Sequence, residues 1–345
     1  MLYTVIEKHL RPNINGSVYW LWRVSRVRIE EISWIIRRIF RLNHIVSGYY
    51  GEPAFWKENR DRSIVIAKNI RGDCYRPAIF VHGILPRCGS NIVHDIVDTH
   101  PDVVGREIGI SEFPILCNCR AMDAFYSSVV SRYRKFSETV SGIEMMSFLL
   151  SGMMRDIQVR IGADKCALLK IPSVQHLEMF DALFPRDKLV VVIRDGRDIA
   201  HSTRKTWKGN RSFVRSDVAI AREYANASLE IEQCKQQMAM RGNDNIYIFR
   251  YEDYVHDPRK AVKALYLFLG LTIDDSILDK AVNLPVRGSS SMKAAGGRAS
   301  WTPAEKPADF SPVEKWKGWS HGRMRRFTNE AQQALITLGY EKSRK

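Results

Sequence analysis

The stretch that decides the fold is Ala78-Ile79-Phe80-Val81, followed shortly by Pro86-Arg87-Cys88-Gly89-Ser90-Asn91. The first run is apolar without alternation, which predicts a strand buried on both faces. The second run predicts a loop, and a helix follows from about Ser90 to Thr99. In such a strand, loop and helix, backbone N–H groups and the positive end of the helix converge on one point. We therefore predict an anion site at Gly89, suited to a nucleotide phosphate.

Two common phosphate loops can be compared with this segment. A Walker A loop continues from glycine into Lys and then Ser or Thr, which neutralise the phosphates and hold Mg²⁺. A dinucleotide loop has the pattern G-x-G-x-x-G and an acidic residue about 20 positions later. Neither pattern is present around Gly89. A nucleotide-dependent phosphotransferase is therefore an alternative that lacks its expected Lys and magnesium ligands.

A second loop follows the apolar run Leu189-Val190-Val191-Val192-Ile193. Arg194 stands at the end of that strand, and Ser202 lies two helical turns further along the chain. A guanidinium and a hydroxyl at this spacing can hold a phosphate through a charge-assisted fork and a second donor. The pairing of the two loops favours a nucleotide site over two structural turns.

The remaining predicted strands are Cys166-Ala167-Leu168-Leu169 and Ile246-Tyr247-Ile248-Phe249, each followed by a helix-like segment. Strands without alternation are typical of a parallel sheet covered on both faces. The sequence therefore predicts a three-layer α/β fold with a central parallel sheet flanked by helices. Asp257-Pro258 and Gly270 predict the two ends of one helix. Residues 284 to 322, rich in Gly, Ser, Pro and Lys, predict a long loop.

Composition and charge limit the classes of function. Hydrophobic residues make up 45% of the chain, which predicts a folded protein, and the net charge of +15 predicts an anionic partner. No apolar run approaches the ~20 residues of a membrane span. Glu7, Lys8 and Arg11 interrupt the place of a signal-peptide core, so we expect a cytoplasmic protein. The six cysteines are thinly spread and predict reduced thiols.

The N-terminal part of the chain differs from the rest. Residues 1–75 are predicted to form a basic, helical extension, and residues 76–345 a single main domain. Within residues 20 to 42, apolar side chains recur at helical spacing among arginines. This helix either packs on the main domain or makes peripheral contact with an anionic membrane surface.

With several motifs in this order, the chain resembles the PAPS-dependent sulfotransferases, where PAPS is 3′-phosphoadenylyl sulfate. In that family a loop of the form P-[RK]-[SC]-G-[ST]-[TN] binds the 5′-phosphosulfate, and an Arg with a Ser eight positions later binds the 3′-phosphate. Both motifs are present here, and the similarity covers roughly residues 78 to 340. It is greatest to the bacterial and protein-tyrosine branch, and it implies a fold like that of P-loop NTPases. Residues 76–345 are then a sulfotransferase domain.

The resemblance also implies a set of catalytic residues. Glu112 is the expected base that takes the acceptor's proton, and Glu107 is its rival, with His82 or His94 as further alternatives. Arg87 and Lys170 are expected to stabilise charge on the bridging oxygen. The sulfuryl group carries less charge than a γ-phosphoryl group, so fixed cations can replace a metal ion and no metal is expected.

For the nucleotide, the resemblance implies contacts from both loops and from the C-terminal segment. Tyr251 is expected to face the adenine. One departure is Ile92, which stands where cytosolic members carry a Trp that stacks on adenine, and their C-terminal Arg-Lys-Gly triplet is missing as well. The expected cofactor-binding residues are Arg87, Cys88, Gly89, Ser90, Asn91, Arg194, Ser202, Tyr251, Ser289, Ser290 and Lys315.

The function implied is transfer of a sulfuryl group from PAPS to an acceptor hydroxyl, carried by a glycan or another biosynthetic product. Acceptor contacts are expected within residues 111 to 160, residues 205 to 225 and the extension. Besides a phosphotransferase, the alternative is a non-catalytic protein that binds an anion, nucleic acid or a membrane surface, as the basic charge would allow. The two phosphate loops argue against that class, so no nucleic-acid partner is expected.

Overall fold

The structure, a computed structural model of the chain, describes residues 59–130, 133–207, 216–289, 302–307 and 310–343. The predicted helix within residues 20 to 42 and its membrane contact lie outside the described residues, as does Ser290.

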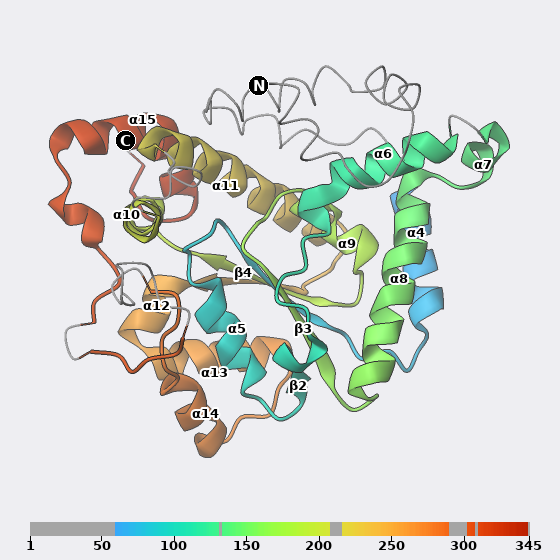
Figure 1. Cartoon of the computed structure of the whole chain (residues 1–345), viewed down its shortest axis with the longest axis horizontal. Helices are drawn as coiled ribbons and strands as arrows, with labels where there is room; N and C mark the ends of the chain where they lie inside the picture. The colour runs from blue at the N-terminus through green and yellow to red at the C-terminus, as the bar shows by residue number, and fades with distance from the viewer. Residues whose placement is uncertain (1–58, 131–132, 208–215, 290–301, 308–309, 344–345) are drawn as a thin grey trace, which may run out of the picture. The chain divides into compact units, whose positions relative to one another are not determined.

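A five-stranded parallel sheet forms the centre of the fold, with strand order β2-β3-β1-β4-β5 (Figure 1). Val81 in the middle of β1 lies opposite Lys170 of β3 on one side and Val190 of β4 on the other. All five residues of β1 are buried, as continuous apolar runs predict. The bounds of the strands are β1 Ile79–Gly83, β2 Val103–Val104, β3 Cys166–Ile171, β4 Lys188–Ile193 and β5 Ile246–Arg250.

The four predicted strands and the predicted three-layer α/β fold are confirmed. The additional strand is β2, which pairs with β3 at the edge of the sheet. It has only two residues, too few to give an apolar pattern in the sequence.

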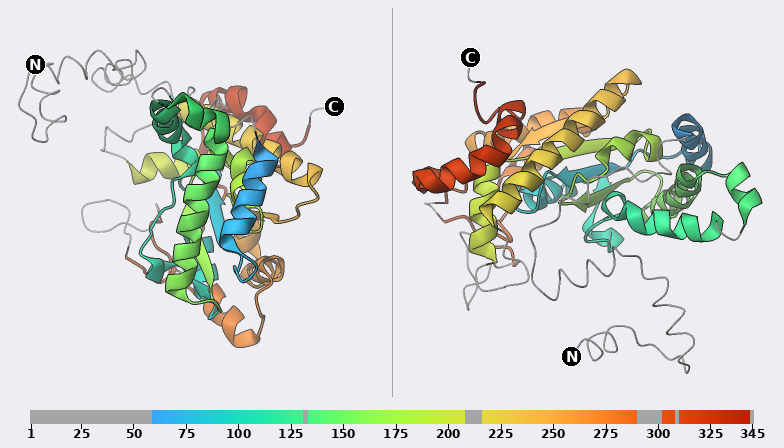
Figure 2. Two further views of the ribbon diagram at one scale, coloured as in Figure 1. Left: turned by 90° about the vertical axis from the view of Figure 1, so that its right-hand side faces the viewer. Right: turned by 90° about the horizontal axis from the view of Figure 1, so that it is seen from above.

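Helices cover both faces of this sheet. In Figure 1, α5, α13 and α14 lie on one side, and α10, α11 and α15 lie on the other. Helices α4 and α8 pack side by side although they are distant in the chain (Figure 2). The α-helices are α4 Arg60–Arg71, α5 Ser90–Asp98, α6 Cys119–Val130, α7 Arg134–Thr139, α8 Gly142–Ile161, α9 Phe180–Leu183, α10 Gly196–Thr206, α11 Asp217–Met240, α12 Tyr251–His256, α13 Pro258–Leu269, α14 Asp275–Val282 and α15 His321–Thr337. The 3₁₀ helices are η2 Arg106–Ile108, η3 Leu116–Asn118, η4 Leu177–Met179 and η5 Lys315–Gly318.

The ends of α13 illustrate how local sequence positions these helices. The Asp257 side chain accepts a hydrogen bond from the backbone N–H of Lys260 at 3.0 Å, and Pro258 occupies the first turn. Gly270 ends the helix in the left-handed conformation with φ of 70°. Both predicted ends are confirmed.

The core around β1 is aromatic. The Phe80 ring contacts the rings of Phe113, Phe180 and Phe184 at centroid distances of 5.7, 5.2 and 4.6 Å. All four side chains are buried. This cluster joins β1 to α9 and to the chain that carries Glu112, so it fixes the segment next to the candidate base.

A buried ion pair joins α4 to the start of β4. Asp187, which is fully buried, accepts hydrogen bonds from the Tyr75 hydroxyl at 2.7 Å and the Ala78 N–H at 2.8 Å, and it pairs with Arg71. Every partner of this carboxylate is therefore supplied by the segment that leads into β1.

The predicted loop from 284 to 322 is largely irregular where it is described. It contains η5 and one antiparallel bridge between Val286 and Ala304. Among the described residues, no helix is long and apolar enough to cross a membrane.

Candidate active site

A cavity lies at the carboxyl ends of β1, β4 and β5, where parallel α/β sheets bind ligands. Residues that follow these three strands line it together with the C-terminal segment, which here means Val286 to Ser289 and Phe310 to Lys315. Five of the lining side chains are cationic. Nine of the predicted site residues are among them: Arg87, Gly89, Ser90, Asn91, Arg194, Ser202, Tyr251, Ser289 and Lys315. The others are Ile92, Asp95, Asp198, His201, Lys205, Val286, Arg287, Gly288, Phe310 and Pro312.

Gly89 sets the shape of the first loop. Its φ of 103° lies in the left-handed region that favours glycine, and it stands directly before α5. A Cβ atom built on Gly89 would lie 2.4 Å from Cδ2 of Tyr251. The backbone thus approaches the aromatic ring directly, and the amino end of α5 at Ser90 and Asn91 faces the cavity.

Gly89→Ala is expected to weaken binding of adenosine 3′,5′-bisphosphate (PAP) by about tenfold, because both the left-handed backbone and the contact with Tyr251 must change. Calorimetric titration with PAP measures this loss. Gly109→Ala is the matched control, since Gly109 has a φ of 78° but open space around a built Cβ atom. Equal PAP affinities of the Gly89 and Gly109 variants would contradict the predicted anion site at Gly89.

Two arginines converge on the same cavity. Arg87 donates from Nε to the Ser202 hydroxyl at 3.2 Å and also bonds the Gly288 carbonyl. Arg194 donates to the carbonyls of Arg87 at 2.8 Å and Pro312 at 2.6 Å. Burial, and then the charge of Arg194, lowers the pKa of Arg87 to about 10. The side chains of Arg87 and Arg194 therefore join both loops and the C-terminal segment.

Tyr251 begins α12 and lies between these groups. The Cζ atom of Arg194 lies 5.0 Å from the centroid of the Tyr251 ring, and the ring also lies close to Gly89. Burial raises the pKa of Tyr251, so its hydroxyl is protonated at neutral pH. The residue lines the cavity, while its expected position against the adenine stays a prediction.

Lys170, Asn91 and Glu112 form a chain of contacts that leads out of the cavity. Lys170, which is 8% exposed, donates to the Asn91 side-chain oxygen at 2.9 Å. Its Nζ atom also lies 3.5 Å from Oε1 of Glu112. Burial lowers the pKa of Lys170, and the neighbouring Glu112 carboxylate opposes that shift. A cation thus lies between a cavity residue and the candidate base.

Backbone pairing positions Glu112. The Phe113 N–H donates to the Lys170 carbonyl at 2.8 Å, which holds the neighbouring Glu112 beside the end of β3. The Glu112 side chain is 51% exposed, whereas that of Lys170 is 9% exposed. An acceptor can therefore approach Glu112 from solvent.

The other sequence candidates lie elsewhere. Glu107 lines a separate hollow on η2 with Val104, Ile108, Ile157, Arg160 and Ile161. The His82 ring pairs through Nδ1 with the Ser173 carbonyl, and burial lowers the pKa of His82 to about 4. Cys88 is fully buried behind the loop, and burial raises the pKa of its thiol. His94 contacts Asp95 at 3.4 Å.

Sequence reasoning missed two anchors of the C-terminal segment. Asp198 accepts hydrogen bonds from the N–H groups of Glu314 at 2.7 Å and Lys315 at 2.8 Å. Asp95 accepts a bond from Nε of Arg287 at 2.6 Å. Asp198 could have been found, because it lies one helical turn before Ser202 on the predicted helix that follows Arg194. The Asp95 contact spans a long sequence separation and left no local signal.

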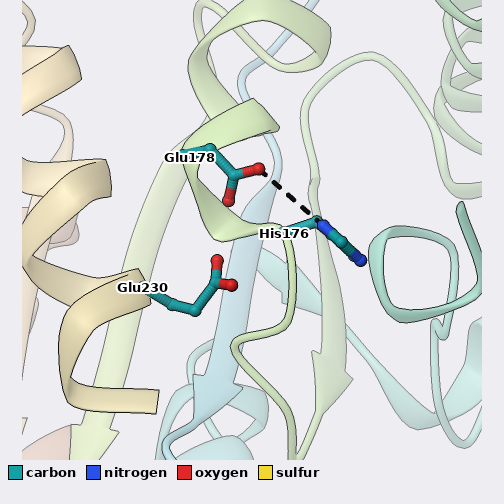
Figure 3. A group of neighbouring side chains, drawn as sticks. All are labelled: His176, Glu178 and Glu230. Carbon is teal, nitrogen blue, oxygen red and sulfur yellow. Dashed lines mark ion pairs between the residues drawn. The ribbon is translucent and has the colours of Figure 1, made fainter. Parts of the chain in front are cut away.

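A buried cluster of His176, Glu178 and Glu230 lies outside the residues that line the cavity (Figure 3). Nδ1 of His176 is 3.8 Å from Oε1 of Glu178, and Glu230 of α11 faces Glu178. One oxygen of each Glu is buried without a hydrogen-bond partner among the described residues. Burial and Glu178 raise the pKa of Glu230 to about 9. Glu230 therefore holds a proton at neutral pH. The expectation of no metal stays a prediction.

Glu230→Gln is expected to remove part of the pH dependence of stability. Between pH 4.5, the ordinary pKa of Glu, and about 9, the native chain holds a proton that the unfolded chain releases. The free energy of unfolding therefore falls as pH rises through this window, by up to about 1.4 kcal/mol per pH unit. Gln cannot ionise, so the variant loses this slope.

Chemical denaturation at several pH values between 5 and 9 measures the slope. Glu232→Gln on the same helix serves as the control, because Glu232 pairs with Lys235 instead of a carboxylate. The same slope in wild type and Glu230→Gln would show that Glu230 is not protonated in the native protein.

The parallel sheet and the cationic cavity at its carboxyl edge are typical of an α/β protein that binds an anionic ligand such as a nucleotide. Comparison with known proteins identifies the family within this class of protein. The model of the sulfotransferase family matches residues 77–275. The chain belongs to the sulfotransferase family.

Individual relatives are distant. Protein-tyrosine sulfotransferase 1 of Danio rerio is 23% identical over 269 residues, which cover 77% of this chain and 72% of the relative. The protein-tyrosine sulfotransferase of Drosophila melanogaster is 24% identical over 272 residues, and this chain spans about half of its length (52%). Among solved structures, the sulfotransferase domain of the Synechococcus PCC 7002 olefin synthase gives a TM-score of 0.45 at 17% identity, covering 78% of this chain and 96% of that domain.

The resemblance to sulfotransferases that the sequence motifs indicated is therefore confirmed at the level of the family. The chain is a sulfotransferase, and the donor expected from the sequence is PAPS. The cavity suits that donor, because guanidinium groups and a helix amino end face the space where phosphates would lie. The phosphotransferase alternative gains no support from these comparisons.

Proposed function

We propose that the cavity binds PAPS and that the sulfuryl group passes to a hydroxyl held beside Glu112 and Lys170. The contacts from Asn91 to Lys170 to Glu112 carry this proposal, because they connect a residue of the cavity with a solvent-facing carboxylate. A reaction centre between donor and base needs such a connection.

In the proposed reaction, Glu112 accepts the proton of the acceptor hydroxyl while the acceptor oxygen attacks sulfur in line. The bond between sulfur and the 5′-phosphate oxygen breaks, and PAP leaves. Negative charge grows on that bridging oxygen, so Lys170 and Arg87 are its stabilising cations. PAPS supplies the activated sulfuryl group, and the chain supplies position, proton acceptance and fixed charge.

For the nucleotide, the proposed contacts follow the two loops. The 5′-phosphate lies at the amino end of α5, at Gly89, Ser90 and Asn91. The 3′-phosphate lies at Arg194 and Ser202, two residues that Arg87 joins through its bond to the Ser202 hydroxyl. Tyr251 faces the adenine, and Ser289 and Lys315 close the cavity from the C-terminal segment.

The proposed acceptor is a tyrosyl hydroxyl of a polypeptide. Two observations support this choice: the relatives named above are protein-tyrosine sulfotransferases, and Glu112 is open to solvent, as a polymeric acceptor requires. The net charge of +15 favours an acidic polypeptide. A carbohydrate hydroxyl, the expectation from the sequence, is the second candidate.

Transfer of ³⁵S from labelled PAPS tests the acceptor. The panel contains an acidic peptide with one Tyr, the same peptide with Phe in its place, and a neutral and a basic oligosaccharide. We expect label in the Tyr peptide and none in the Phe peptide. Label confined to an oligosaccharide would replace the tyrosyl acceptor with a carbohydrate.

Two expectations about location stay predictions of the sequence. They are the cytoplasmic location and the peripheral contact of residues 20 to 42 with an anionic membrane.

A further inference from the structure

His201 lines the nucleotide cavity but has no role in the reaction proposed above. It lies on α10 directly before Ser202, and Lys205 follows it by one helical turn on the same face. The imidazole therefore belongs to the part of the cavity where the 3′-phosphate is proposed to bind.

The ring has one buried nitrogen without a partner. Nδ1 of His201 is inaccessible to water and makes no hydrogen bond to any part of the chain that the structure describes. A proton on Nδ1 would be a buried donor without an acceptor, which is costly. The neutral ring therefore carries its proton on Nε2, which leaves Nδ1 the nitrogen that must gain a proton if the ring becomes charged.

Cations surround this ring on four elements. Lys205 of α10, Arg194 at the end of β4 and Lys315 of η5 line the same cavity as His201, and Arg323 of α15 adds a fourth positive charge nearby. Burial lowers the pKa of His201, and these four charges lower it further. The protein without nucleotide therefore holds the imidazole neutral at pH 7.

The nearby carboxylates are already engaged. Asp198 accepts two backbone N–H groups of the C-terminal segment, at Glu314 and Lys315. Asp217 pairs with Arg323 at 2.8 Å and with Arg204 at 3.0 Å. Positive charge thus dominates around His201 until an anion enters the cavity.

We propose that His201 senses the 3′-phosphate by taking up a proton when the nucleotide binds. The inference rests on the proposed position of that phosphate at Arg194 and Ser202. A phosphate dianion would offset the cations that hold the imidazole neutral and would accept the Nδ1 proton, which has no other acceptor, and the imidazolium then adds one positive charge beside Arg194. By linkage, nucleotide affinity rises as pH falls, and release of PAP becomes easier as pH rises.

Calorimetry in two buffers of different ionisation enthalpy tests proton uptake at pH 7. PAP is compared with adenosine 5′-monophosphate, which lacks the 3′-phosphate. His201→Gln is the informative variant, because an amide can donate a hydrogen bond but cannot take a proton. His256→Gln is the matched control, since His256 is exposed on α12 and outside the cavity lining.

We expect PAP to bind with uptake of a fraction of a proton in wild type and in His256→Gln. No such uptake is expected with adenosine 5′-monophosphate or in His201→Gln. We further expect the Kd of PAP to rise between pH 6 and pH 8 by about three- to tenfold more in wild type than in His201→Gln.

Three results would overturn the inference. Unchanged proton uptake in His201→Gln would assign the proton to another group, and absence of uptake in wild type would remove the proton altogether. In both cases tight, 3′-phosphate-dependent binding would leave the proposed nucleotide site standing. Equal affinity for PAP and adenosine 5′-monophosphate would instead overturn the position of the 3′-phosphate, and with it this inference.

Discussion

Glu112→Gln is expected to lower kcat by about 10²- to 10⁴-fold while leaving the Kd of PAP within about twofold of wild type. Gln fills the same volume and can still contact Lys170, but it cannot accept a proton. The Glu112 carboxylate lies outside the residues that line the nucleotide cavity, so donor binding does not depend on it. Single-turnover transfer from labelled PAPS and calorimetry with PAP together measure the two effects.

Glu107→Gln is the matched control for that experiment. Glu107 is the other carboxylate that the resemblance allows as base, and it lines a hollow away from the nucleotide cavity. We expect this variant to retain its kcat. If Glu107→Gln lost turnover and Glu112→Gln kept it, the two assignments would have to be exchanged.

Arg194→Lys is expected to weaken PAP binding by about 100-fold or more, because Lys keeps a charge but not the planar fork that holds a phosphate. The Arg194 guanidinium also donates to two backbone carbonyls, which orient it toward the cavity. Adenosine 5′-monophosphate should lose much less affinity, since the proposed partner of Arg194 is the 3′-phosphate. Calorimetry with both ligands measures the difference.

Folding must be separated from binding in this variant, because Arg194 joins the loop at Arg87 to Pro312. A thermal unfolding midpoint near that of wild type keeps the binding result interpretable. Arg222→Lys is the control, since Arg222 pairs with Glu330 on the surface and is remote from the cavity. Equal losses for PAP and adenosine 5′-monophosphate would contradict the assignment of Arg194 to the 3′-phosphate.

The sequence was sufficient for four of the five strands of the central sheet, because strands buried on both faces leave continuous apolar runs. Four strands and both ends of α13 were predicted from such local signals. β2 was not predicted, since two residues carry no periodicity and its pairing with β3 is a tertiary contact. The predicted loop from 284 to 322 agrees with the described residues up to the start of α15 at His321, but its bridge between Val286 and Ala304 depends on the fold around it.

The residues of the candidate site also fall into those that the sequence could predict and those that it could not. Cavity-lining residues that follow the strands, such as Gly89 in the loop after β1 and Arg194 at the end of β4, could be predicted because α/β sheets collect ligand contacts there. Asp95 and Arg287 could not, since a buried carboxylate and a loop arginine meet only after folding. Burial alone would raise the pKa of Asp95, but hydrogen bonds from His94, Arg287 and Arg106 hold it well below its usual value. That carboxylate therefore stays ionised and anchors Arg287 at the cavity.

Calorimetric titration of the purified protein with PAP, with ADP as the control, tests the central claim most directly, because it requires no knowledge of the acceptor. If the 3′-phosphate binds at Arg194 and Ser202, we expect a Kd on the order of micromolar for PAP and much weaker binding of ADP, which lacks the 3′-phosphate. Equal affinity for the two nucleotides would contradict a PAPS site at Arg194 and Ser202.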